Sequence, residues 1–188
     1  MKRLKEKILR CGRILDGGVL KVDSFLNHQI DPDIMMEIAL EFRRRFEHLN
    51  PTKILTIEAS GIAPAILTGF VMHLPIVFAK KSVPVTMSNT FTSTAHSFTK
   101  RCDYQINIAK RYLSPDDRVI FIDDFLAYGN TALAILDICQ QAGAKVESMG
   151  FVLAKEFQGG ADILRSKGID ITILANILSL DNNEVHYV

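Results

Sequence analysis

Four apolar residues that lead directly into two adjacent acids constrain this sequence more than any other feature. The apolar run occupies 119–122, the acids are Asp123 and Asp124, and a loop of mostly small residues follows at 125–131. A continuous apolar run of this kind is typical of a strand buried in a parallel sheet. The pattern of 131–142 indicates a helix after the loop. Because open α/β sheets bind ligands beyond the carboxyl ends of their strands, we expect a site at this loop.

The residue types at this loop suit a ribose 5-phosphate. Free N–H groups at the N-terminus of a helix attract phosphate, and neighbouring carboxylates can accept hydrogen bonds from sugar hydroxyls. The loop is not a P-loop, because no Gly-Lys-Ser/Thr follows a glycine at the required spacing. The plain alternative is an ordinary strand, turn and helix with a solvated pair of acids.

Strands and helices alternate along the rest of the chain, which predicts an α/β fold with a mainly parallel central sheet flanked by helices. Residues 82–99 are rich in Ser and Thr without a sustained period. We expect them to form a lid over the site, with a polar β-hairpin as the alternative. The expected strands are 19–22, 53–57, 75–79, 104–110, 119–122, 146–153 and 169–174, and the expected helices are 2–11, 33–48, 62–72, 131–142 and 162–167.

A second loop of small residues follows the strand expected at 53–57 and contains Ser60 and Gly61. Two such loops at one edge of a sheet could bind two separate phosphate groups, although glycine here could serve chain geometry alone. A further strand ends at Lys80 and Lys81. Adjacent lysines usually form a solvated edge, but at the carboxyl end of a strand they can neutralise a phosphate.

The composition excludes several classes of protein. A chain of 188 residues with a formal net charge of +1 has no bulk field that favours nucleic acid or a membrane surface. The apolar region 62–79 is interrupted by proline and glycine and is not expected to span a membrane. The three cysteines are too scattered for a disulfide framework or a zinc site. With no signal peptide recognisable, we expect a cytoplasmic protein.

Residues 119–131 resemble the signature of type I phosphoribosyltransferases, the enzymes that use 5-phosphoribosyl 1-pyrophosphate (PRPP). The resemblance implies the fold of this family, PRPP and a purine base as substrates, Mg²⁺ as cofactor, and a homodimer. It also implies one domain, 1–188, with a small hood formed by the terminal segments at about 1–32 and 155–188.

The resemblance also assigns roles to residues. It implies that Asp123 and Asp124 are the catalytic acids, which bind the ribose hydroxyls and hold the metal through water and PRPP. In this family the loop before the helix at 62–72 holds pyrophosphate. The implied PRPP-binding residues are Ala127, Tyr128, Gly129, Asn130, Thr131, Ser60, Gly61, Lys80 and Lys81.

Blocks at 20–32, 58–64 and 97–100 extend the resemblance over nearly the full chain. They imply purine salvage with xanthine as the base, joined through N9 to give xanthosine 5'-monophosphate (XMP) and pyrophosphate. By the same resemblance Leu20 and Asn27 contact the base and Lys155 approaches its oxo groups, while Phe157 is a stacking partner. The plain alternatives are a core leucine, a turn asparagine and a surface lysine.

Other functions remain open at this point. The base could be hypoxanthine, guanine or adenine. A PRPP-sensing transcriptional regulator is disfavoured, because such a protein should carry an additional DNA-binding domain and only about twenty residues precede the first motif block. A Rossmann dehydrogenase is disfavoured because the sequence lacks G-x-G-x-x-G.

Overall fold

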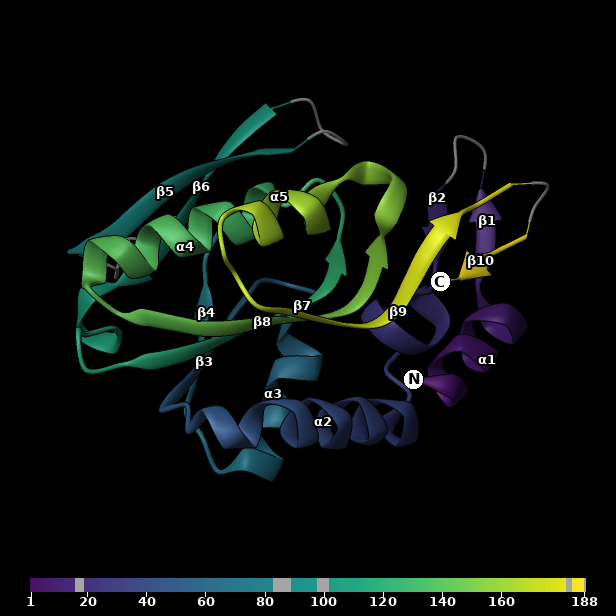
Figure 1. The fold of residues 1–188 in the computed structure, drawn as a ribbon, viewed down its shortest axis with the longest axis horizontal. Coiled ribbons are helices and arrows are strands. Elements are labelled where there is room, and N and C mark those ends of the chain that lie inside the picture. The colour runs from purple at the N-terminus through teal and green to yellow at the C-terminus, as the bar shows by residue number, and fades with distance from the viewer. Residues whose placement is uncertain (16–18, 83–88, 98–101, 182–183, 188) are drawn as a thin grey trace.

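The computed structural model describes residues 1–15, 19–82, 89–97, 102–181 and 184–187. Its centre is a six-stranded sheet in the order β10-β9-β8-β7-β3-β4 (Figure 1). All neighbours pair in parallel except β10, which runs antiparallel to β9 at one edge. The sheet strands are β3 (Lys53–Ile57), β4 (Ile76–Ala79), β7 (Arg118–Leu126), β8 (Lys145–Lys155), β9 (Ile171–Ser179) and β10 (His186–Tyr187).

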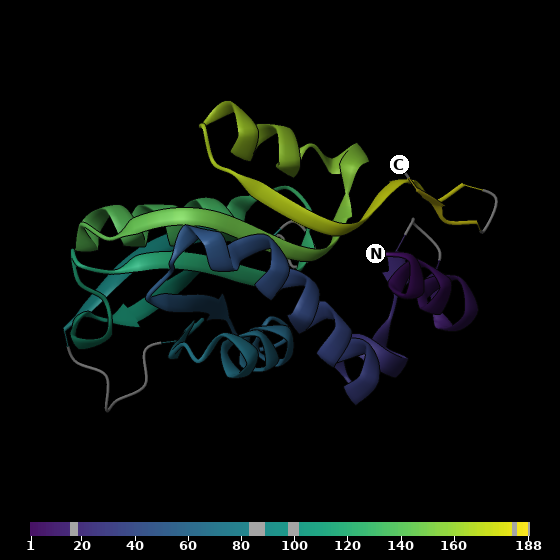
Figure 2. The ribbon, with the colours of Figure 1, turned by 60° about the horizontal axis from the view of Figure 1, so that its bottom comes forward.

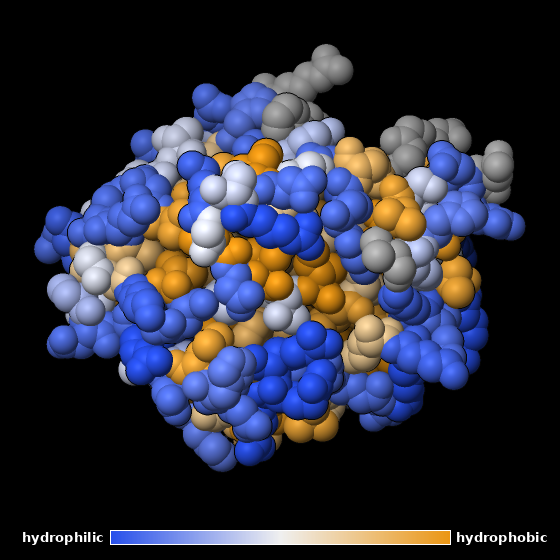
Figure 3. Space-filling view, in the orientation of Figure 1, coloured by the Kyte–Doolittle hydropathy of each residue, from blue (hydrophilic) through white to orange (hydrophobic). Residues whose placement is uncertain are grey.

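Helices cover both faces of this sheet, so the predicted α/β architecture is confirmed. In Figure 1, α2 (Pro32–Phe46) and α3 (Ile62–Met72) lie on one face, and α4 (Asn130–Ala142) and α5 (Gly160–Ser166) lie on the other. Each face has its own buried apolar cluster. In the space-filling view, apolar residues show in a central band between these layers, and hydrophilic residues cover much of the outside (Figure 3).

The two ends of the chain meet at one end of the sheet (Figures 1 and 2). Helix α1 (Lys2–Cys11) and the antiparallel pair β1 (Arg13–Leu15) and β2 (Val19–Lys21) lie there beside β9 and β10. The amino group of Met1 donates to the carbonyl oxygen of Leu174 over 2.6 Å. The hydroxyl of Tyr187 donates to the carbonyl oxygen of Lys5 over 3.4 Å. Contacts between distant parts of the chain therefore hold both terminal segments.

The expected lid is partly wrong. Residues 90–97 form β5 (Thr90–Ser97), which pairs in antiparallel register with β6 (Cys102–Ala109) along its whole length. Threonine favours extended backbone because its branched Cβ is stiff, and the paired strands lie against α4. Residues 90–97 therefore agree with the alternative, a polar β-hairpin, rather than with a lid. The rest of the expected lid, at 83–88 and 98–99, lies outside the described residues.

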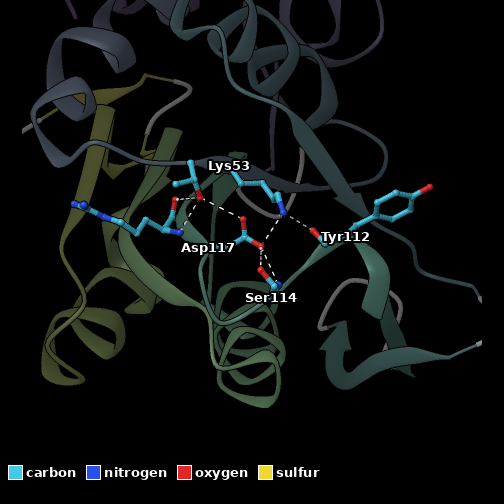
Figure 4. A network of polar contacts seen from close by, with 6 residues as sticks. Lys53, Tyr112, Ser114 and Asp117 are labelled. Atoms are coloured by element: carbon cyan, nitrogen blue, oxygen red, sulfur yellow. Dashed lines mark hydrogen bonds and ion pairs between the residues drawn. The ribbon is translucent and has the colours of Figure 1, made fainter.

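A largely buried ion pair joins the N-terminal ends of β3 and β7, at the edge opposite the predicted site (Figure 4). The ammonium group of Lys53 donates to Asp117 Oδ2 and to the carbonyl oxygen of Tyr112, each over 2.7 Å. The backbone N–H and hydroxyl of Ser114 donate to the same carboxylate, and Thr52 Oγ1 donates to its other oxygen.

Among the described residues, no helix is both long and apolar enough to cross a membrane.

Candidate active site

A cavity of about 240 Å³ opens at the carboxyl ends of β7 and β8. It brings together the first acid, the predicted phosphate loop and the predicted base-binding lysine, although these lie far apart in the sequence. The strand before the loop is longer than predicted, since β7 continues through both acids to Leu126. The lining residues are His96, Tyr104, Asp123, Phe125, Leu126, Ala127, Tyr128, Gly129, Asn130, Thr131, Ala132, Phe151, Lys155 and Gln158.

The predicted phosphate loop ends at the N-terminus of α4, which begins at Asn130. Gly129 precedes the helix with a φ of +84°, a conformation that glycine adopts without a steric penalty. This geometry leaves backbone N–H groups of the first helical turn at the cavity, where they can bind an anion. The hydroxyl of Thr131 lies 2.9 Å from that of Tyr104 on β6, so the strand pair β5 and β6 supports the loop.

The two acids have different surroundings. Asp123 lines the cavity, and its Oδ1 accepts a hydrogen bond from the backbone N–H of Asp124 over 2.9 Å. Burial, together with the charge of Asp124, raises the pKa of Asp123 well above its ordinary value. Asp124 lies outside the cavity lining. Its two oxygens accept hydrogen bonds from the Asn27 amide over 3.0 Å and the Ser60 hydroxyl over 2.9 Å.

The second predicted loop packs directly against the first acid. A Cβ on Gly61 would lie 2.4 Å from Thr56 Oγ1 and 2.7 Å from Asp123 Oδ1, so this position admits no side chain without movement. The peptide bond between Glu58 and Ala59 is cis. Gly61 precedes α3, and the loop therefore presents the start of a second helix next to the acids.

The predicted lysines follow β4 beside this second loop. The backbone N–H of Lys81 donates to Glu58 Oε1 over 2.6 Å, while Lys80 pairs through its backbone with Asn107 of β6. The ammonium group of Lys81 lies 5.5 Å from the centre of the Tyr104 ring, whose hydroxyl contacts Thr131 of the first loop. Lys81 thus lies between the two predicted phosphate loops, whereas the ammonium of Lys80 lies over the ring of Phe78.

Of the four predicted base-binding residues, only Lys155 lines the cavity. It is half-buried, and burial lowers its pKa. Leu20 is buried in the apolar cluster that also contains Phe25 and Leu26. Phe157 is 51% exposed in a short helical turn after β8 and does not line the cavity. Asn27 contacts Asp124 instead.

Sequence reasoning missed several residues at this site. His96 and Tyr104 reach the cavity from β5 and β6, and the backbone carbonyl of His96 accepts from the Asn130 amide over 3.0 Å. Gln158 lines the cavity, and its side-chain oxygen is buried without a hydrogen-bond partner among the described residues. Gly160 packs against the predicted phosphate loop. No local sequence pattern marks these residues, because each reaches the site through tertiary contacts.

Known structures identify the fold. Adenine phosphoribosyltransferase from Rhodothermus marinus superposes with a TM-score of 0.77 at 18% identity, covering 94% of this chain and 100% of that chain. The enzyme from Trypanosoma brucei, in complex with AMP, pyrophosphate and ribose-5-phosphate, also has a TM-score of 0.77 at 18% identity. Its alignment covers 92% of this chain and 79% of the trypanosomal one. The chain therefore has the fold of the type I phosphoribosyltransferases.

Sequence relatives identify the family. Xanthine phosphoribosyltransferase from Listeria monocytogenes is 49% identical over 189 residues, covering 100% of this chain and 98% of the relative. The Lactobacillus gasseri protein of the same name is 46% identical with the same coverage. No protein-family model matches the chain. The chain belongs to the xanthine phosphoribosyltransferase family, which confirms the predicted enzyme class, a transferase.

Proposed function

We propose that this protein transfers the 5-phosphoribosyl group of PRPP to N9 of xanthine and releases XMP and pyrophosphate. The family membership supports this reaction. The observation that carries it at the site is the shared cavity, in which Asp123, the phosphate loop and Lys155 lie together. These groups match the three parts of the reactants: ribose hydroxyls, the 5-phosphate and the oxo groups of the base.

In the proposed reaction xanthine first loses a proton to solvent, and a nitrogen of the resulting anion attacks the anomeric carbon as the bond to the pyrophosphate oxygen breaks. The bonding electrons leave with pyrophosphate, and the sugar gains oxocarbenium character. In this proposal the carboxylates of Asp123 and Asp124 stabilise the positive charge on the ring. The N-terminus of α4 would hold the 5-phosphate through residues 127–131, and the loop with Ser60 and Gly61 would hold pyrophosphate, helped by Lys80 and Lys81.

We further propose that Asp123 and Asp124 hold Mg²⁺ through water and PRPP. The described residues contain no group of three or more His, Cys, Asp or Glu placed to hold a metal ion. The donor set still fits Mg²⁺, because this ion usually takes one or two carboxylates, several waters and phosphate oxygens of the substrate. When bound, it would neutralise charge on the departing pyrophosphate.

For the base, we propose that Lys155 approaches the oxo groups of xanthine, with Leu20, Asn27 and Phe157 completing its contacts. An ammonium donor suits a purine with two carbonyls better than adenine, whose exocyclic amine is itself a donor. Because Phe157 is exposed and Asn27 is engaged with Asp124, both would have to move when the base binds.

We also propose a cytoplasmic homodimer in which residues 1–188 form one domain, with a hood from the terminal segments. Three large apolar residues on α3 and the edge strand β4 support a self-association surface. Ile66 and Phe70, one helical turn apart on α3, are 48% and 69% exposed, and Phe78 on β4 is 41% exposed. Light scattering of the purified protein tests the dimer.

An assay with purified protein tests the reaction. With PRPP and Mg²⁺ in each reaction and xanthine, guanine, hypoxanthine or adenine added separately, we expect xanthine to give nucleotide with the highest kcat/KM. A higher value for another base would overturn the proposed substrate, and the absence of nucleotide with all four would overturn the reaction. Asp124→Ala should lower turnover by about 100-fold or more. A variant that keeps the wild-type rate would contradict the role of this acid.

A further inference from the structure

Asp124 is held by three hydrogen-bond donors from three segments. Its Oδ2 accepts from the side-chain amide of Asn27 over 3.0 Å, and its Oδ1 accepts from the Ser60 hydroxyl over 2.9 Å and from the Phe125 backbone N–H over 3.0 Å. Asn27 ends the helical turn Asp23–Asn27, which is remote in sequence from the acid. Asp124 itself is only 5% exposed.

These donors differ in how readily they can leave. The Phe125 N–H belongs to the same strand as the acid, and Ser60 is half-buried in the loop before α3. Asn27 is exposed, and so are its neighbours in the chain, His28 and Gln29. The Asn27 amide is therefore the contact of Asp124 that can be exchanged with the least rearrangement of the fold.

A carboxylate offers about four lone-pair positions, and three are occupied here. Ser60 and Phe125 take both positions of Oδ1, so a ribose hydroxyl that reaches Asp124 has to use Oδ2, to which the Asn27 amide already donates. Ribose hydroxyls and the Asn27 amide are both neutral donors, so they compete for the same oxygen.

We propose that Asn27 is a positioning residue of the ribose site, whose amide holds Asp124 until ribose hydroxyls displace it. This inference rests on the proposed reaction with PRPP. Once displaced, the exposed side chain of Asn27 can turn to contact the base, while the turn Asp23–Asn27 stays anchored by its buried residues Phe25 and Leu26. The exchange makes the base site complete only after the ribose site is filled, so PRPP favours binding of xanthine.

The exchange predicts opposite effects on the two substrates. Asn27→Ala removes the competitor for Asp124, so PRPP and ribose 5-phosphate should bind about 2- to 10-fold more tightly, the range that one such hydrogen bond represents. The same variant removes a donor to the base, so the KM for xanthine should rise. If Asn27 had only a structural role, the variant would bind both substrates more weakly. If it only contacted the base, the affinity for PRPP would be unchanged.

Calorimetric titration with three probes tests the exchange. PRPP with Mg²⁺ and ribose 5-phosphate both carry the ribose hydroxyls, whereas inorganic pyrophosphate lacks them. The dissociation constant of pyrophosphate should therefore be the same for wild type and Asn27→Ala. Ser24→Ala is the matched control, because Ser24 lies in the same turn but donates to the carbonyl oxygen of Cys11. It should leave all three dissociation constants unchanged.

Unchanged or weaker binding of ribose 5-phosphate by Asn27→Ala overturns the exchange. If wild type forms nucleotide in the assay, such a result leaves the proposed reaction standing. If wild type binds no PRPP, both proposals fail. A second measurement needs no variant titration: in ¹H–¹⁵N spectra of the wild type, the side-chain amide signal of Asn27, assigned by its absence in Asn27→Ala, should shift with ribose 5-phosphate. A signal that does not move also overturns the exchange.

Discussion

The backbone N–H of Gly160 donates a hydrogen bond to the carbonyl oxygen of Ala127 over 3.1 Å. This contact joins the first residue of α5 to the predicted phosphate loop. A Cβ on Gly160 would lie 2.3 Å from the same oxygen and 2.8 Å from the nitrogen of Gly129. The segment after Lys155 therefore fixes the position of the loop and, with it, the spacing between Lys155 and the predicted phosphate loop.

Gly160→Ala should disturb the predicted phosphate loop although alanine favours helix. We expect the KM for PRPP to rise several-fold and the free energy of unfolding to fall by about 1–3 kcal/mol, because the new methyl forces backbone atoms apart. Gly168→Ala is the control. Gly168 has a φ of +74°, and a Cβ added there would meet no described atom within 4 Å, so this variant carries backbone strain without the clash. Equal values of KM for the two variants would contradict this account.

Asp123→Asn should stabilise the ligand-free protein and abolish turnover. The pKa of Asp123 is raised by burial and by Asp124, so above pH 3.8 the folded state binds more protons than the unfolded state. The stability of the wild type therefore falls as pH rises through this window. The amide of Asp123→Asn carries no charge to bury. We therefore expect its free energy of unfolding to exceed that of the wild type by about 1 kcal/mol at pH 7, a difference that shrinks towards pH 4. Denaturant unfolding at both pH values measures it. A variant less stable than the wild type at pH 7 would refute the prediction.

Lys155→Met should weaken the binding of xanthine more than the binding of PRPP. The half-buried ammonium donates towards the base in the proposed complex, so its loss should raise the KM for xanthine by about 10- to 100-fold, the range for a charged hydrogen bond. Lys145→Met on the same strand is the control, since Lys145 lies at the opposite end and pairs with Glu147. Steady-state kinetics with each substrate varied in turn decides. A larger rise in the KM for PRPP would indicate that Lys155 binds the phosphate groups and not the base.

Asp117→Asn should destabilise the fold by about 3 kcal/mol at pH 7 without changing turnover, because it leaves the largely buried Lys53 ammonium without its charged partner. Burial works to raise the pKa of Asp117, but hydrogen bonds from Lys53 and Ser114 lower it overall. The stabilisation is therefore present above pH 3.8 and is lost as pH falls through the lower pKa of the folded state. Urea unfolding between pH 2 and 7 should show the two proteins converging in acid.

The double change Lys53→Met with Asp117→Leu is the matched control, since it removes both charges and should cost less than Asp117→Asn alone. A double variant less stable than the single variant would show that the ion pair itself, rather than the unpaired charge, carries the stability. Turnover should be unaffected in both, because the pair lies at the far edge of the sheet from the cavity.

The local sequence determined the α/β alternation, the buried strand with its acids and the helix that begins after the loop. Each of these is encoded by apolar period or by glycine at the turn. The expectation of a lid was wrong at 90–97, where the alternative of a polar β-hairpin holds, because the partner strand and α4, not the local period, decide the conformation.

Only the tertiary structure decided which groups share the site. The amide of Asn27 reaches Asp124, and Gly160 reaches Ala127, across long separations in sequence. Such contacts depend on how layers pack and on the direction of each side chain, which leave no period in the sequence. Asp123 and the loop residues that line the cavity with it could therefore be predicted from their own strand and loop, whereas the residues that hold them in place could not.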